Sequence, residues 1–264
     1  MGIKIFSQLI LVYILATAVV YFLSDYSIFP APASSYQTLP DLVKIKTADG
    51  KSISAIYLPN PEAKYTLIYS HGNAEDLGTI YSTLQSFNAM HLSVIGYDYA
   101  GYGSSDGKAS EKATYADIQA VYDYLIKQHN VQPDHIILFG RSLGTGPSVE
   151  LAAKQPVGGL ILESGFTSAY RVVTHYPVFM FDKYNNISKL QKIHVPILFI
   201  HGLQDAVVPF WHGKALFDAY NGPKQSYWLP NAGHNDIDAN ETLYKNVIYA
   251  YVAMLPQYAT LAQN

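Results

Sequence analysis

The sequence lacks cysteine altogether and has few charged residues. Without cysteine, disulfides, thiol nucleophiles and thiolate metal sites are excluded. Charged residues make up only 14% of the 264, the net charge is −3, and the 17 Lys and Arg residues form no block. Nucleic acid is therefore not expected as a partner. No His, Asp and Glu residues have the spacing of a known metal site, so no metal is expected either.

Charge is also missing from one long N-terminal stretch. Residues Ile5 to Leu23 are 19 residues without a charge, which as a helix would extend about 28 Å, close to the thickness of a bilayer's hydrocarbon core. A cleaved signal peptide is the alternative, and it would leave a secreted protein. Its apolar core is usually shorter, and a small-x-small site should follow closely. We predict an uncleaved membrane anchor over residues 1–28.

The side of the membrane is indicated by the flanking charges. Lys4 and the amino terminus precede the apolar stretch, and Asp25 is the near charge that follows it. The positive-inside rule then places the remainder of the chain outside the cytoplasm, in the periplasm if the protein is bacterial. The sequence carries no signal for an oligomeric state.

After a Pro- and Ser-containing linker over 29–40, residues 41–258 have the pattern of one α/β domain. A hairpin is predicted around Asp49 and Gly50. Compact apolar runs then alternate with amphipathic helical patterns such as 113–130, which predicts a mostly parallel, doubly wound sheet covered by helices on both faces. The predicted strands of this part are 65–70, 92–98, 135–140, 159–164, 195–202 and 225–230.

A serine lies between two glycines directly after one of these runs, in "IILFGRSLGTG" (136–146). The motif G-x-S-x-G between a strand and a helix is typical of a nucleophile held at a sharp turn. Small residues two positions before and after the serine avoid collisions at such a turn. We predict that Ser142 is a nucleophile; a glycine-rich turn without chemistry is the alternative.

A serine nucleophile needs a histidine base and a carboxylate that orients the base. His234, in "LPNAGHND", follows the last predicted strand, where its ring can reach the carboxyl edge of the sheet. Asp205, in "HGLQDAVVP", follows the strand before it and is the predicted acid. Glu163, at the end of an earlier strand, is the rival acid.

The oxyanion of an acyl-transfer intermediate needs backbone donors. The N–H of Leu143, directly after the nucleophile, is one predicted donor. The other is the N–H of Asn73 in "YSHGNAED", with Ala74 as the alternative. His71 in the same loop is predicted to shape the loop rather than act as a base.

The motifs together resemble the α/β-hydrolase superfamily, over roughly residues 40 to 255. They are "YSHGNAEDLG", "YDYAGYGSSDGKASE", "FGRSLGTGP", "HGLQDAVVP" and "AGHND". More narrowly, the chain is similar to the α/β-hydrolase-domain proteins related to membrane-associated acyl-protein thioesterases (depalmitoylases) and to their single-pass type II relatives. The depalmitoylases carry a Cys-rich, lipidated N-terminus, whereas this chain has a hydrophobic stretch there.

The resemblance implies an α/β-hydrolase fold and a serine hydrolase that cleaves esters or thioesters without a cofactor. It implies Ser142 as nucleophile, Asp205 as acid, His234 as base, and the amides of Asn73 and Leu143 as oxyanion donors. A short aromatic lid over about 165–190 and the nearby anchor favour acyl chains of lipids or acylated proteins as substrates. A serine peptidase of the same fold, for which Glu163 or Asp182 would bind a peptide amine, and a non-catalytic binding domain are the alternatives.

Overall fold

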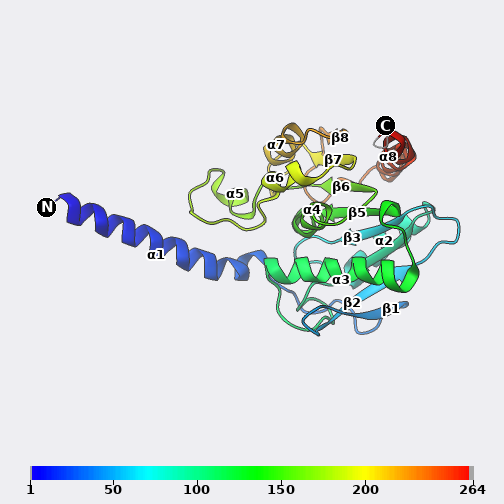
Figure 1. Cartoon of the computed structure of the whole chain (residues 1–264), viewed down its shortest axis with the longest axis horizontal. Coiled ribbons are helices and arrows are strands. Elements are labelled where there is room, and N and C mark those ends of the chain that lie inside the picture. Colours follow the sequence, from blue (N-terminus) through cyan, green and yellow to red (C-terminus); the bar gives the residue numbers. More distant parts are fainter. Residues whose placement is uncertain (1, 262–264) are drawn as a thin grey trace.

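A single eight-stranded sheet organises the chain in the computed structural model, which describes residues 2–261 (Figure 1). The strand order is β1-β2-β4-β3-β5-β6-β7-β8, and the β2 pairings with β1 and β4 are antiparallel, whereas the strands from β4 to β8 pair in parallel. This is the α/β-hydrolase fold with an antiparallel N-terminal hairpin, and it confirms the predicted fold class. The strands are β1 (Leu42–Lys46), β2 (Ser52–Leu58), β3 (Thr66–Ser70), β4 (Ser93–Tyr97), β5 (Ile136–Arg141), β6 (Gly159–Glu163), β7 (Ile197–Gly202) and β8 (Lys224–Leu229).

The parallel strands are apolar on both faces because helices cover both faces. Alternate residues of β5 show this arrangement. Ile136 and Leu138 belong to the core cluster formed with α3, α4 and α7, whereas Ile137 and Phe139 belong to the cluster formed with α2 and α8. The covering helices are α2 (Leu77–Asn88), α3 (Glu111–His129), α4 (Thr145–Ala152), α7 (Trp211–Ala219) and α8 (Glu241–Leu261).

Helix α1 (Gly2–Ile28) projects from the body of the molecule (Figure 1). Within it, Lys4–Ile28 is long and apolar enough to cross a membrane, and only 6% of its most apolar window is buried. A signal sequence would have the same length and composition. The segment after it is tied to the domain, because Ser35 bonds to Asp76 and Tyr36 bonds to Asp98 at the end of β4.

Candidate active site

Ser142 lies at a sharp turn between β5 and α4, in the short 3-10 helix η2 (Ser142–Gly144). Its φ of 50° is in the left-handed region, a strained conformation for a residue with a side chain. A Cβ on Gly144 would lie 2.0 Å from the carbonyl oxygen of Ser70, and one on Gly140 would lie 2.5 Å from that of Gly144. The two glycines of the motif are therefore required by close backbone approach.

A Gly144→Ala variant should be clearly less stable than the wild type. The clash is with backbone atoms of β3, which cannot rotate away, and overpacking of this kind typically costs about 1–3 kcal/mol or more. Gly165→Ala is the matched control, because its nearest contact is a Leu216 methyl carbon at 3.2 Å, which can move. Chemical denaturation of both variants measures the difference; equal free energies of unfolding would contradict the argument.

The structure brings Ser142, His234 and Asp205 into one hydrogen-bonded chain. His234 Nε2 is 3.0 Å from Ser142 Oγ, and His234 Nδ1 is 2.7 Å from Asp205 Oδ2. Ser142 follows β5, Asp205 follows β7 and His234 follows β8. Because parallel strands end at one edge of the sheet, three residues distant in sequence meet there.

Asp205 is held by donors other than the histidine. The amides of Val207 and Val208 donate to its Oδ1 at 2.9 and 2.7 Å, and the Ser164 hydroxyl donates to Oδ2 at 3.0 Å. Burial disfavours its charged form, but the hydrogen bonds from His234 and Val208 outweigh that effect and lower the pKa of Asp205. The carboxylate is thus ionised and fixed facing His234.

Glu163, the rival acid, is engaged elsewhere. The Tyr244 hydroxyl of α8 donates to its Oε2 at 2.6 Å, and Arg141 Nε lies 3.3 Å from its Oε1. Burial raises the pKa of Glu163, and the positive charge of Arg141 offsets part of that rise. The nitrogen of His234 that an orienting acid must meet is occupied by Asp205.

The amides of the two predicted oxyanion donors differ in their hydrogen bonding from the amide of Ala74, the alternative donor. Within residues 2–261, the amides of Asn73 and Leu143 have no hydrogen-bond partner. The amide of Ala74 donates to Asn73 Oδ1 at 2.9 Å. Of the two loop residues, Asn73 therefore has the amide that is not already engaged within the described part of the chain. His71 is fully buried, with Nδ1 2.8 Å from the carbonyl oxygen of Gly72, in agreement with a loop-shaping role.

Arg141, the residue of the G-x-S-x-G motif directly before Ser142, links two loops of the site. The sequence alone did not identify it as a functional residue. Its Nη1 donates to Glu75 at 2.7 Å, and the other carboxylate oxygen of Glu75 accepts the Gly72 amide at 2.6 Å. Its Nη2 donates to Asn235 Oδ1 at 2.9 Å and to the His234 carbonyl at 3.2 Å. The arginine thus ties the loop of the predicted oxyanion donor to the loop of the histidine.

Within the described part of the chain, no three His, Asp or Glu side chains cluster as a metal site would require. The segment predicted as a lid contains α5 (Ala169–Thr174) and α6 (Asn186–Lys189). Several of its large apolar side chains are exposed, in contrast to the buried core beneath.

Comparison with known proteins places these observations in context. The family model described as "Serine aminopeptidase, S33" matches residues 61–186. Alpha/beta hydrolase domain-containing protein 17B of Xenopus tropicalis is 41% identical over 221 residues, covering 81% of this chain and 73% of the relative. The human protein of that name is 41% identical, covering 73% and 68%. Among solved structures, the Pyrococcus furiosus esterase Pf2001 superposes with a TM-score of 0.71 at 15% identity, covering 84% and 95% of the two chains.

Proposed function

The chain belongs to the α/β-hydrolase domain-containing protein 17 family and is a serine hydrolase of esterase or thioesterase type, and from this premise we propose that Ser142, His234 and Asp205 are its catalytic triad. The observation that carries the proposal is the hydrogen-bonded chain from the Ser142 hydroxyl through His234 to Asp205. The strained turn at Ser142 supports the same assignment, as do the amides of Asn73 and Leu143, which have no partner among the described residues.

The proposed reaction is a two-step acyl transfer. His234 Nε2 takes the hydroxyl proton as Ser142 Oγ attacks the acyl carbon, and returns it to the departing alcohol or thiol. Water then attacks the acyl-enzyme, giving its proton to the same nitrogen, and the carboxylic acid leaves as Ser142 recovers its hydrogen. Asp205 holds the Nδ1–H tautomer and stabilises the imidazolium. The amides of Asn73 and Leu143 would bind the oxyanion in both steps.

The proposed substrates are acyl chains carried by lipids or proteins. Support comes from the exposed apolar side chains of the lid and from the apolar helix α1, which would hold the site beside lipid. We propose that α1 is a single membrane span with the domain outside the cytoplasm, as Lys4 indicates.

A peptidase that binds a substrate's amino group would need a carboxylate free to receive it. Glu163 is paired with Arg141 and Tyr244, and Asp182 accepts from Ser168 at 2.6 Å and from the Tyr170 amide at 2.9 Å. Because both candidate acids are already occupied, an ester or thioester fits the site better than a peptide amine.

Two measurements test the proposal. A fluorophosphonate probe should label the full-length protein at Ser142, because only an activated serine reacts; absence of labelling would support a non-catalytic binding domain. Initial rates on p-nitrophenyl esters of increasing chain length should then rise with length, since longer chains bury more apolar surface. A flat profile, or faster cleavage of aminoacyl amides, would contradict the proposed substrate class.

A further inference from the structure

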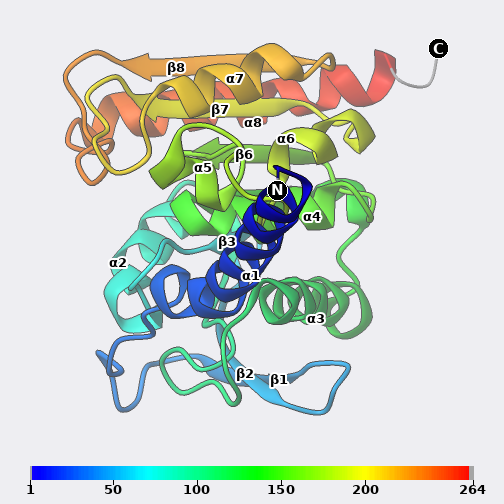
Figure 2. The ribbon, with the colours of Figure 1, turned by 90° about the vertical axis from the view of Figure 1, so that its left-hand side faces the viewer.

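Helix α1 contacts the lid from Tyr13 onward. The Tyr13 hydroxyl donates to the carbonyl oxygen of Val178 at 2.7 Å, and Ser24 Oγ lies 2.9 Å from the Tyr170 hydroxyl. In Figure 2, which faces the N-terminal end of α1, the lid helix α5 lies beside α1. Two polar side chains of this helix thus bond to the lid, whereas most of its large apolar side chains are exposed.

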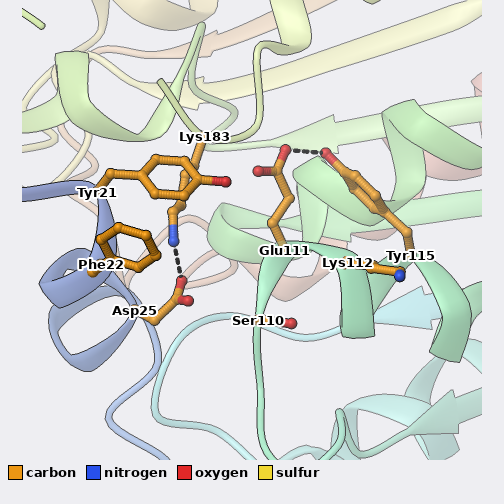
Figure 3. Close-up of a pocket in the computed structure, with 8 residues that line it drawn as sticks. All are labelled: Tyr21, Phe22, Asp25, Ser110, Glu111, Lys112, Tyr115 and Lys183. Atoms are coloured by element: carbon orange, nitrogen blue, oxygen red, sulfur yellow. Dashed lines mark hydrogen bonds and ion pairs between the residues drawn. The ribbon is translucent and has the colours of Figure 1, made fainter. Parts of the chain in front are cut away.

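An ion pair fixes the end of α1 to the end of the lid. Asp25 bonds to the ammonium of Lys183, whose side chain is only 5% exposed, and this ammonium lies 4.8 Å from the ring centre of Tyr21 (Figure 3). Tyr21 in turn meets Phe181 edge-on at 6.1 Å. The pair lines a cavity of about 440 Å³ whose opposite wall is the start of α3. Helix and lid are therefore joined at both a polar and an aromatic contact.

The lid presents an apolar surface to its surroundings. Five large apolar side chains within nine residues expose between 49 and 81% of their area: Val173, Tyr176, Val178, Met180 and Phe181. Exposed large apolar side chains gathered in one short segment are typical of an interaction surface. Helix α1, which contacts the lid through Tyr13, Tyr21 and Ser24, also exposes large apolar side chains, so both sides of this contact are apolar and exposed.

The positions along α1 that contact the lid indicate what covers the apolar surface of the lid. The nine residues from Lys4 to Val12 would extend only about 14 Å, which cannot cross a hydrocarbon core of about 30 Å. If α1 crosses the bilayer, its span must therefore include the half from Tyr13 onward that touches the lid. About 20 residues from Lys4 complete the crossing near Leu23. The Asp25–Lys183 pair then lies at the membrane surface. Val178, which bonds to Tyr13, lies below that surface, inside the bilayer.

We propose that residues 173–181 of the lid are embedded beside α1 in the leaflet that adjoins the domain, and that the partner of this apolar surface is the bilayer. The inference rests on the proposed membrane span of α1. The backbone of Val178 supports it, because lipid offers no hydrogen bonds: its carbonyl accepts from Tyr13, and its amide donates to the Tyr176 carbonyl at 2.9 Å. An acyl chain could then reach the site from the leaflet without crossing water.

The absence of cysteine allows a direct test by single-cysteine labelling of the full chain. Met180→Cys reports on the lid, Val12→Cys on the proposed span, and Leu243→Cys, on an exposed position of α8, is the matched control. Each variant carries an environment-sensitive fluorophore and is reconstituted in phosphatidylcholine vesicles with spin-labelled acyl chains. We expect the labels at positions 12 and 180 to be quenched and blue-shifted, and the label at position 243 to behave as in water.

Two results would overturn the proposal, and they differ in meaning. Quenching at position 12 with water-like emission at position 180 would show a membrane span whose lid stays outside the bilayer. Water-like emission at both positions would remove the span and the embedded lid together. Hydrolysis of p-nitrophenyl acetate by the same three proteins reports on the serine-hydrolase proposal separately, because this ester is soluble and needs no membrane.

Discussion

Replacing Ser142 with alanine is expected to lower kcat for p-nitrophenyl acetate by roughly 10⁵- to 10⁶-fold, as removal of a triad nucleophile does in other serine hydrolases. The hydroxyl supplies the oxygen that becomes acylated, and no other group of the hydrogen-bonded chain can replace it. The remaining activity would come from the oxyanion donors and from binding alone.

Ser148→Ala is the matched control for this variant. Ser148 lies in α4, just after the nucleophile turn, and its buried Oγ has no hydrogen-bond partner among the described residues. Its removal should leave kcat almost unchanged. Thermal unfolding of both variants checks that the fold is intact. A folded Ser142→Ala protein with wild-type turnover would eliminate the acyl-enzyme mechanism.

Changing Asp205 to asparagine should reduce kcat by about 10⁴-fold. The carboxylate accepts the Nδ1–H of His234, which leaves Nε2 free to take the serine proton. An asparagine amide can donate to Nδ1 instead and so favour the wrong tautomer. It also lacks the charge that stabilises the imidazolium.

Glu163→Gln distinguishes the two acids that the sequence leaves in competition. Glutamine keeps an oxygen for the Tyr244 hydroxyl, but it loses the charge that pairs with Arg141. We expect a loss of stability larger than the loss of turnover, because Glu163 does not touch His234 Nδ1. Steady-state kinetics and denaturation are measured on both variants. A reversed order, with turnover lost in Glu163→Gln and kept in Asp205→Asn, would exchange the roles of the two residues.

Local patterns were sufficient to predict the fold and to bring the three proposed catalytic residues together. Apolar runs bounded by helical patterns predict buried parallel strands, and such strands must place Ser142, Asp205 and His234 at one edge. The glycines around Ser142 could be interpreted because their steric requirement lies within a few residues of the chain.

Contacts between distant loops could not be predicted in this way. Arg141 meets Glu75 and Asn235, which lie 66 and 94 residues away, and a lone arginine in the motif does not identify its partners. Glu163 remained a rival acid because its partner Tyr244 belongs to the last helix. The packing of α1 on the lid was missed for the same reason, since apolar periodicity reports the character of a helix and not its neighbour.

The Asp25–Lys183 pair also bears on how the enzyme should be produced. A truncated form beginning after Ile28, the usual route to a detergent-free preparation, would remove both the counter-ion of Lys183 and the Tyr21 ring beside its ammonium. The shortened protein would then relax where the lid is anchored, and its selectivity would misrepresent that of the intact molecule.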